Sequence, residues 1–295
     1  MQSFKRLTKD DVELIFPFFE KECSLACDCS IGGTFIWADY FKTEYLIIDD
    51  TLIFKVEENG EKRYTYPLGK NIDGALSYAE ADAKGNGISL SFFVFNEENL
   101  KKLQERYGKS ETEEKRGNFD YVYDYKSLST FKGKKLSGQR NHVNKFKRLY
   151  PDYTFEEIGE KNKEELRDFF LRFSSQSEKT NPAIEAEKKK IFELIENPSA
   201  YRQFGGILKA SGDIVGFSFA EIIGNTMFVH IEKANIEYAG VYQMLVSTFA
   251  SHFSREGVIY INREDDVDDE GLRKSKLSYH PLFLLKKYIL RANNG

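Results

Sequence analysis

The chain has 295 residues, of which 41% are hydrophobic and 31% are charged, and its formal net charge at pH 7 is −4. This balance is that of an ordinary globular protein and excludes a disordered chain, while the near-neutral charge means that any anion-binding site must be a local feature. The length predicts two domains of about 150 residues each. No stretch reaches the roughly 18 apolar residues of a membrane span. The first residues lack an apolar signal-peptide core, so we expect a cytoplasmic protein.

The first half of the sequence predicts helices combined with a mainly antiparallel sheet. Thr8 can cap a helix that extends to residue 21, with Asp11 three residues on as its capping-box partner. Turns at Asp49-Asp50 and Asn59-Gly60 separate three short strands, which predicts a β-meander. The meander strands are expected at residues 45–48, 51–56 and 63–66. They are followed by a strand at 88–95, a helix at 97–106 and a strand at 119–125.

Three cysteines lie close together in the loop after the first helix, at Cys23, Cys27 and Cys29. Their C-x3-C-x-C spacing matches no common zinc-binding pattern, and no fourth ligand lies nearby in the sequence. Half-buried thiols that stay reduced are the ordinary alternative inside a cell. The sequence therefore predicts no metal site.

The second half repeats this order of elements. Two amphipathic helices precede a second meander, which is followed by a mostly apolar helix, a strand, a short helix and a final strand. These elements span residues 164–173, 184–196, 204–209, 214–222, 226–233, 241–253, 258–262, 270–278 and 282–290. The repetition predicts an α+β protein with two domains, residues 1–130 and 131–295, each a mixed, mainly antiparallel sheet flanked by helices.

A basic segment, residues 132–148, links the two halves. It contains seven Lys or Arg residues among 17 and no acid, within a protein that is acidic overall. As a helix it places Val143 and Phe146 on an apolar face and basic side chains on the opposite face. Ser137 can cap its N-terminus, where free backbone N–H groups attract phosphate. The segment predicts a phosphate-binding surface, and the alternative is a solvated linker helix. The residues expected to contact phosphate are Lys135, Arg140, Asn144 and Lys145.

Two predicted strands end in polar clusters, and the first carries a histidine and a glutamate. Side chains alternate between the faces of a strand, so Val229 and Ile231 should share one face and His230 and Glu232 the other. A buried sheet carries two ionisable side chains on one face only where that face opens onto a cleft or pairs them. His230 and Glu232 therefore suit a general base or a contact to a substrate amine, and the alternative is a structural His–Glu pair.

The second polar cluster follows strand 258–262 and continues into the next helix. Carboxylates and basic side chains at this point can clamp a charged substrate or stabilise an oxyanion, and the alternative is a surface ion-pair network. The residues concerned are Asn262, Arg263, Asp265, Arg273 and Lys276. One apolar helix joins strand 226–233 to strand 258–262, which predicts a crossover between parallel strands that are adjacent or nearly so. We therefore expect the two clusters to lie together.

Three phrases of the sequence together resemble a known family. They are Lys134-Lys135 with Arg140-Asn141-His142-Val143-Asn144, His230-Ile231-Glu232-Lys233-Ala234 with Gly240-Val241-Tyr242-Gln243, and Asn262-Arg263-Glu264-Asp265-Asp266 with Gly271-Leu272-Arg273-Lys274-Ser275-Lys276-Leu277-Ser278-Tyr279. They resemble the family named for the C-terminal domain of phosphatidylglycerol lysyltransferase. The resemblance implies two tandem acetyltransferase-like (GNAT) folds, related to the Fem peptidoglycan aminoacyl ligases. The best-known relatives move an amino acid from aminoacyl-tRNA to a lipid hydroxyl or a peptidoglycan amine.

The resemblance and the residues together predict an acyltransferase that moves an aminoacyl group from aminoacyl-tRNA to a small amine or hydroxyl acceptor. The expected catalytic residues are His230, Glu232 and Asp265, and Tyr242 joins the substrate-binding residues named above.

Two departures from the family pattern qualify this expectation. Loop 235–240 lacks the glycine-rich pyrophosphate loop of CoA-dependent GNAT enzymes, so acetyl-CoA is the less favoured donor. We expect no membrane domain like that of the lipid-modifying relatives, so a lipid is the less expected acceptor. The alternatives are a CoA-dependent N-acyltransferase and a non-catalytic module that binds a small anion or an amino acid.

Overall fold

The computed structural model describes residues 3–176 and 181–292, and the chain divides into two compact units. Unit 1 comprises residues 1–120, 265–269 and 284–295, and unit 2 comprises residues 121–264 and 270–283. Each unit has its own sheet, as the repeated order of elements predicts. The domain division at residue 130 stays a prediction. Residues 121–130 belong to unit 2, and the later segments 265–269 and 284–295 belong to unit 1.

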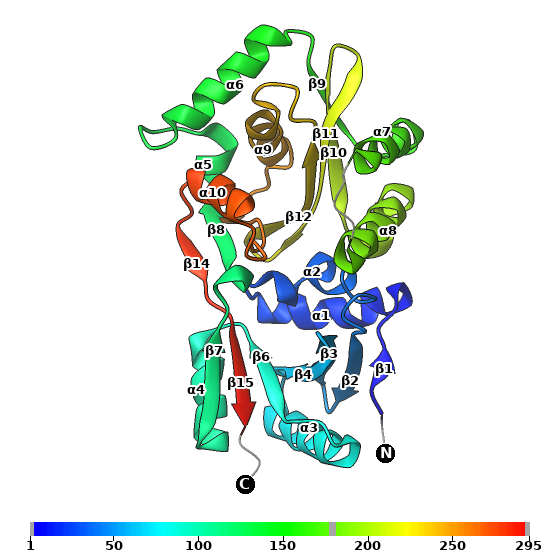
Figure 1. Cartoon of the computed structure of the whole chain (residues 1–295), viewed down its shortest axis with the longest axis vertical. Helices are drawn as coiled ribbons and strands as arrows, with labels where there is room; N and C mark the ends of the chain where they lie inside the picture. Colours follow the sequence, from blue (N-terminus) through cyan, green and yellow to red (C-terminus); the bar gives the residue numbers. More distant parts are fainter. Residues whose placement is uncertain (1–2, 177–180, 293–295) are drawn as a thin grey trace. The chain divides into compact units, whose positions relative to one another are not determined.

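Unit 1 is built on an eight-stranded mixed sheet in the order β1-β2-β3-β4-β6-β15-β7, with β5 paired to β3 (Figure 1). Its strands are β1 (Lys5–Arg6), β2 (Glu44–Ile48), β3 (Thr51–Glu58), β4 (Glu61–Thr65), β5 (Leu68–Gly69), β6 (Ser91–Val94), β7 (Ser110–Glu114) and β15 (Tyr288–Ala292). Its helices are α1 (Val12–Glu22), α2 (Ile31–Phe35), α3 (Ile72–Asn86) and α4 (Glu97–Tyr107). The predicted first helix, the meander β2-β3-β4 and helix α4 are confirmed.

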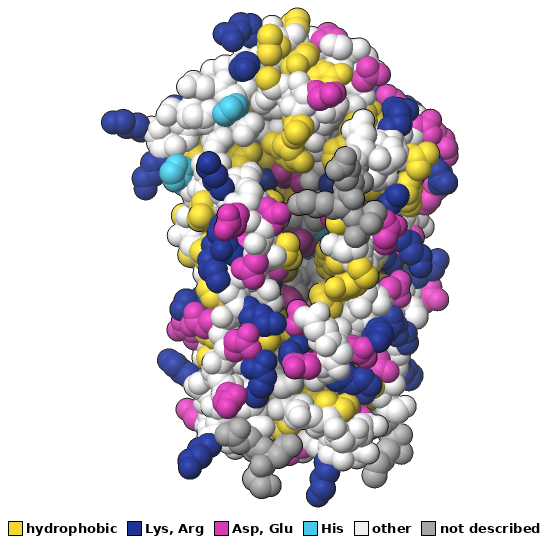
Figure 2. All heavy atoms as spheres, viewed as in Figure 1, with side chains coloured by type: hydrophobic (Ala, Val, Ile, Leu, Met, Phe, Trp, Pro, Cys, Tyr) yellow, Lys and Arg dark blue, Asp and Glu magenta, His cyan; other side chains and the backbone are white. Residues whose placement is uncertain are grey.

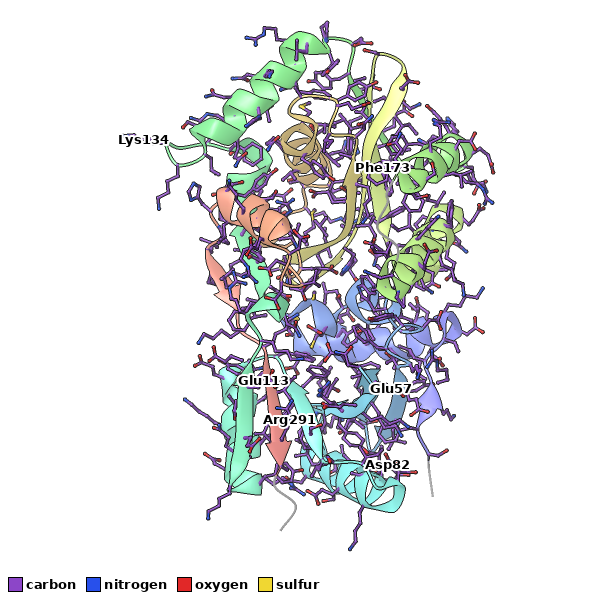
Figure 3. The ribbon with its side chains drawn as sticks, viewed as in Figure 1. Glu57, Asp82, Glu113, Lys134, Phe173 and Arg291 are labelled. Carbon is purple, nitrogen blue, oxygen red and sulfur yellow. The ribbon has the colours of Figure 1, made fainter. Side chains whose placement is uncertain are left out.

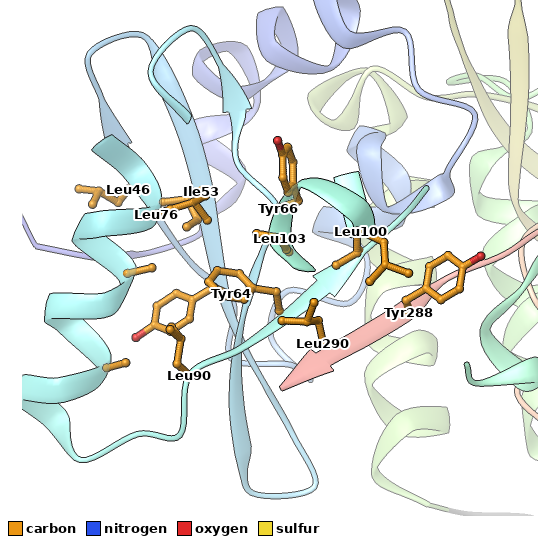
Figure 4. Close-up of a cluster of buried hydrophobic side chains, with 14 residues drawn as sticks. Leu46, Ile53, Tyr64, Tyr66, Leu76, Leu90, Leu100, Leu103, Tyr288 and Leu290 are labelled. Carbon is orange, nitrogen blue, oxygen red and sulfur yellow. The ribbon is translucent and has the colours of Figure 1, made fainter. Parts of the chain in front are cut away.

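The core of unit 1 lies between its sheet and helices α3 and α4 (Figure 4). Tyr64 and Phe92 from the sheet and Leu76 and Leu103 from the two helices are buried in one cluster, together with Leu290 of β15. Helix α1 packs against β3 and β5 on the other side of the sheet (Figure 1). The last strand of the chain is therefore part of the core of the unit that contains the first strand.

Unit 2 is built on a seven-stranded mixed sheet in the order β14-β8-β13-β12-β11-β10-β9. Its strands are β8 (Asp120–Asp124), β9 (Thr154–Glu157), β10 (Phe204–Ala210), β11 (Asp213–Ile223), β12 (Thr226–Ala234), β13 (Tyr260–Asn262) and β14 (Phe283–Leu285). Its helices are α5 (Tyr125–Thr130), α6 (Ser137–Leu149), α7 (Lys163–Ser175), α8 (Pro182–Glu196), α9 (Val241–His252) and α10 (Glu270–Ser278). The second predicted meander, β10-β11-β12, is confirmed.

Helices cover both faces of the unit 2 sheet (Figure 1). On one face, Phe170 of α7 packs edge-on against Phe217 of β11, with ring centroids 5.8 Å apart. On the other face, Leu245 of α9 packs with Val215 of β11 in a buried cluster that also contains Phe146 of α6. None of the described helices is both long and apolar enough to cross a lipid bilayer.

The predicted final strand, residues 282–290, is two strands. Phe283–Leu285 forms the edge strand β14 of the unit 2 sheet, and Tyr288–Ala292 forms β15, which pairs with β6 and β7 in the unit 1 sheet. An ion pair of 2.8 Å between Glu113 of β7 and Arg291 of β15 supports this pairing (Figure 3). Lys286-Lys287 separate the two apolar segments, and the prediction of one strand passed over this polar pair, which marks the division.

Helix α6 begins at Ser137, so the prediction that Ser137 caps the helix is wrong. The capping position is Leu136, and no side-chain hydrogen bond caps the helix. Its apolar face packs on the start of α9, where the backbones approach closely. Gly240 has a φ of 86°, and a Cβ atom there would lie 2.3 Å from the carbonyl oxygen of His142. The N-terminus of α9 is thus covered by α6.

Replacing Gly240 with alanine is expected to lower the free energy of unfolding by about 1–3 kcal/mol, because the new methyl group meets backbone and the φ is unfavourable for any L side chain. Urea denaturation measures the change. Gly138→Ala is the matched control, since Gly138 lies in α6 with open space around it and alanine favours a helix. Equal stability of the two variants would contradict the close approach of α6 and α9.

Candidate active site

Strands β12 and β13 run parallel and side by side, as the crossover prediction requires. They pair only from Thr226 with Tyr260 to Phe228 with Asn262. Beyond that point β12 continues to Ala234, whereas β13 ends. The residues that follow on the two strands therefore meet through side chains instead of backbone hydrogen bonds, and both predicted polar clusters lie here.

A β-bulge in β12 places His230 outside the register with β11. Phe219 of β11 pairs with Ile231, whereas the next residue, Ala220, pairs with Val229. An additional residue in one strand interrupts the alternation of side chains between the two faces of a sheet. The faces predicted from strict alternation therefore do not hold beyond this point.

The prediction that His230 and Glu232 share a face is wrong. Glu232 lines a small cavity together with Met227 and Val229, on the face covered by α9. The His230 ring instead reaches Glu221 of β11 and is parallel to the ring of Phe228. The bulge thus turns the two ionisable side chains to opposite faces of the sheet.

His230 is buried between two carboxylates. Its Nε2 lies 2.8 Å from Glu221 Oε1 and its Nδ1 lies 2.7 Å from Glu264 Oε1. Gln203 Nε2 donates to the same Glu221 oxygen. Burial acts to lower the pKa of His230, but the hydrogen bonds and charges of Glu221 and Glu264 outweigh it and raise the pKa to about 9. At neutral pH the ring is therefore an imidazolium that donates to both carboxylates.

The backbone at Glu264 is held in a strained conformation. Its φ is 54°, a value that a residue with a side chain seldom adopts. Asn262 Oδ1 accepts a hydrogen bond from the Glu264 N–H at 2.7 Å, and the Glu264 carbonyl accepts one from Tyr121 N–H at 3.0 Å. Asn262 is fully buried. In this structure it orients Glu264; contact with a substrate stays a prediction.

Arg263 and Glu232 form a second ionic contact at the point where the strands diverge. Arg263 Nη2 donates to Glu232 Oε1 at 2.6 Å, and the guanidinium lies 4.6 Å from the ring centroid of Tyr279. Burial acts to lower the pKa of Arg263, but the charge of Glu232 raises it above its ordinary value. Arg263 Nη1 is buried and has no hydrogen-bond partner among the described residues, and the side chain borders a cavity of about 10 Å³, room for about one water molecule.

The remaining predicted residues of this region lie around the two ionic contacts. Lys276 of α10 is buried, and its Nζ donates to the Arg263 carbonyl at 2.5 Å. Tyr242 of α9 is half-buried, and burial and the charge of Glu232 raise its pKa. Arg273 of α10 is half-buried. Asp265 belongs to unit 1, so its predicted proximity to Glu232 stays a prediction.

The sequence interpretation did not select Glu221 and Glu264 as site residues. Glu264 stood within the second polar cluster, but nothing in its neighbours distinguished it from Asp265. Glu221 is the one charged residue of the predicted strand 214–222, and it is only 2% exposed. A buried acid requires a partner, so this isolated carboxylate was the available signal.

Only part of the predicted phosphate-binding set gathers around one cavity. Arg140 and Asn144 of α6 line a cavity of about 430 Å³ that α5, α6 and α9 enclose. Lys135 and Lys145 do not line it and are exposed. Lys147, which the sequence interpretation did not select, does line it.

A separate cluster in unit 1 holds the type of side chains that bind metal ions. Ligand atoms of Cys27, Asp28 and Asp120 lie within 4.8 Å of one another. Lys287 Nζ lies 2.5 Å from Asp28 Oδ2, 2.7 Å from Asp120 Oδ1 and 3.3 Å from Cys27 Sγ. Burial acts to lower the pKa of Lys287, but Asp120 and Asp28 raise it well above its usual range. A lysine ammonium thus supplies the cation of this cluster.

Comparison with known proteins places the chain in a family. The family described as phosphatidylglycerol lysyltransferase, C-terminal, matches residues 24–291. The chain belongs to this family. The resemblance drawn from the three sequence phrases is confirmed. A solved structure of a conserved protein of unknown function from Bacteroides thetaiotaomicron is 32% identical, with a TM-score of 0.91 over 99% of this chain and 100% of that chain.

More distant proteins share the fold. The structure of L-PGS from Bacillus licheniformis is 16% identical, with a TM-score of 0.67 over 96% of this chain and 92% of that chain. FemX is 8% identical, with a TM-score of 0.61 over 98% and 97% of the two chains, and a tandem GNAT protein from the clavulanic acid biosynthesis pathway is 9% identical, with a TM-score of 0.50 over 99% of each. The predicted tandem GNAT-like fold is confirmed.

A curated relative matches a shorter region. An uncharacterized protein of Mycoplasmoides gallisepticum is 28% identical over 180 residues, which is 59% of this chain. The chain covers 56% of the length of that relative. The family is thus the one described as phosphatidylglycerol lysyltransferase, C-terminal, and the fold is tandem GNAT-like.

Proposed function

We propose that the protein is an aminoacyltransferase that moves an amino acid from aminoacyl-tRNA to a small amine or hydroxyl acceptor. The observation that carries this proposal is the pair of ionic contacts where β12 and β13 diverge, His230 with Glu264 and Arg263 with Glu232. Acyl transfer needs a base for the attacking nucleophile and a positive charge near the developing oxyanion. These contacts provide a carboxylate and a guanidinium within one short region of unit 2.

Glu264 is the base in this proposal. Its side chain is 20% exposed, the largest value among these ionic side chains, so solvent and substrate reach it most readily. His230, protonated at neutral pH, is a positioning residue that donates to Oε1 and leaves Oε2 to accept a proton. Asp265 follows Glu264 in the sequence, and we retain it as a proposed contributor.

In the reaction, the acceptor nitrogen or oxygen forms a bond to the acyl carbon and its proton passes to Glu264. The ester bond between the acyl carbon and the ribose oxygen of the donor breaks, and that oxygen takes up the proton from Glu264, which restores the base. Arg263 supplies positive charge for the tetrahedral intermediate, and Glu232 holds the guanidinium in place.

The packing of α9 favours aminoacyl-tRNA over the alternative CoA thioester. CoA-dependent GNAT enzymes use a glycine-rich loop for pyrophosphate at the equivalent helix start, and here α6 covers it, with the His142 carbonyl against Gly240. The amide N–H groups of Asn235, Tyr238 and Val241 also have backbone partners already. Little donor capacity is left for a pyrophosphate.

Glu264→Gln tests the proposal. It keeps the size of the side chain and removes the base, so the single-turnover rate of transfer from radiolabelled aminoacyl-tRNA to a panel of amines and hydroxyl compounds should fall by about 100-fold. Glu256→Gln, an exposed acid of the same unit, is the matched control and should keep the wild-type rate. Glu232→Gln is less suitable, because it leaves the buried Arg263 charge uncompensated.

Two results would reject the aminoacyl proposal. One is the absence of transfer by the wild-type protein to every acceptor of the panel. The other is transfer from acetyl-CoA under the same conditions with none from aminoacyl-tRNA, which would favour the CoA-dependent alternative.

A further inference from the structure

The cavity between α5, α6 and α9, which we call the α6 groove, has the lining of an anion site. Its charged side chains, Arg140 and Lys147, are both basic, and no carboxylate among the described residues lines it. Asn144 lies between them in the sequence, and hydroxyl groups of α5 and α9 line it as well. This composition differs from the acidic balance of the whole chain. The groove therefore favours a ligand that carries negative charge.

The α6 groove is distinct from the candidate active site. The side chains of α9 that face the sheet, Val246 and Phe249, line the small cavity beside Arg263. The groove is lined by other residues of α9, among them Ser247 and Thr248, and within the described part of the chain the two cavities share no lining residue. The body of helix α9, about 10 Å across, separates them. A ligand in the groove does not touch Glu264 or Arg263, unless it is long enough to extend around α9.

The volume and the aromatic lining indicate which anion fits. A cavity of about 430 Å³ is larger than a phosphate ion needs and matches a small organic ligand. Tyr153 contributes an aromatic face, and Lys147 Nζ lies 5.9 Å from the centroid of that ring. A cation beside an aromatic ring suits a nucleotide, because the planar base can stack on the ring while the phosphate pairs with the cation.

Basic side chains continue along α6 outside the groove. Lys132, Lys134, Lys135, Lys145 and Arg148 are exposed on the same segment, which contains no acid. Figure 2 shows Lys and Arg side chains, and no acidic ones, over the part of the surface where Figure 1 places α6, and Figure 3 shows Lys134 extending outward just before the helix. These additional positive charges can contact further phosphates of a nucleic-acid chain, which a single nucleotide does not have.

We propose that the α6 groove binds one nucleotide unit of single-stranded RNA, with its phosphate at Arg140 and Lys147 and its base against Tyr153. The inference deepens the proposed function, since it names the part of the donor that this surface holds. The same chemistry is present in a free nucleotide, so the experiment includes both sources.

The test measures the affinity of a fluorescent single-stranded 12-nucleotide RNA by anisotropy at several salt concentrations. Lys147→Ala should weaken binding five- to tenfold and reduce the slope of log K against log salt by about 0.7, the loss of one phosphate contact. Lys145→Ala removes the same charge from the same helix outside the groove and should weaken binding clearly less than Lys147→Ala does. Asn144→Ala should weaken binding without changing the slope. Thermal melts confirm that each variant folds.

The outcomes separate this proposal from the proposed function. Equal effects of Lys147→Ala and Lys145→Ala would overturn it, since the helix would then act only through its total charge. Failure of the wild-type protein to bind both the RNA and AMP would also overturn it. Binding of AMP alone, weakened by Lys147→Ala, would support the groove with a free nucleotide as its ligand. RNA binding that depends on Lys147, in a protein with no transfer activity, would support the groove and reject the proposed function.

Discussion

Replacing Lys287 with methionine is expected to lower the free energy of unfolding by about 3–5 kcal/mol. The ammonium is buried and neutralises Asp28 and Asp120, and Asp120 is fully buried. Methionine keeps most of the volume but leaves the Asp120 carboxylate in the interior without its cation. The loss appears as a lower urea midpoint for the unfolding of unit 1.

Lys286→Met is the matched control. Lys286 is the neighbouring residue, and its ion pair with Glu114 is about half exposed, so its removal should change the urea midpoint little. The double variant Lys287→Met with Asp120→Asn removes both buried charges and should recover much of the lost stability. If Lys287→Met and Lys286→Met unfold at the same urea concentration, the cluster does not stabilise the unit in the way that the geometry indicates.

The sequence predicted those elements whose apolar residues recur with a clear period. Helices α4, α7 and α8 and both meanders carry such patterns. Helix α3 does not: its buried stripe is Ala75, Leu76, Ala79 and Ala83, and alanine is too weakly apolar to mark a face. Strand β7 is polar along its whole length and pairs with β15 from the far end of the chain. Pairing over that sequence distance cannot be inferred from local composition.

The candidate site was predicted as a region but not in its internal arrangement. The crossover rule predicted that the two strands are parallel and that the polar clusters at their ends lie close together. The bulge at His230 depends on how β12 pairs with β11, and nothing in the sequence of β12 marks it. Because a shift of one residue exchanges the faces of a strand, His230 met Glu221 and Glu264 while Glu232 met Arg263. The partners, and hence the roles, could come only from the pairing register.

Stability is expected to fall as the pH rises through about 9, because the folded protein then loses the proton on His230. The folded pKa is raised from 6.5 to about 9, so the unfolded chain releases this proton at lower pH than the folded protein does. The contribution is fully present below about pH 6.5 and disappears above about pH 9, and the difference corresponds to about 3 kcal/mol. Urea denaturation at pH 6.0 and at pH 9.5 measures it.

His230→Gln should remove this pH dependence, because glutamine can still donate to one carboxylate but does not titrate. The variant should be less stable than the wild type at pH 6.0 and closer to it at pH 9.5, where the wild-type ring is itself neutral. His142→Gln, at an exposed position on α6, controls for the loss of a histidine and should keep the wild-type difference between the two pH values. The contrary result is a stability difference between the wild type and His230→Gln that is the same at pH 9.5 as at pH 6.0. It would mean that the ring is neutral throughout and that one carboxylate carries the shared proton. Glu264 would then lose the charged donor that leaves its outer oxygen available, and its assignment as the base would fail with it.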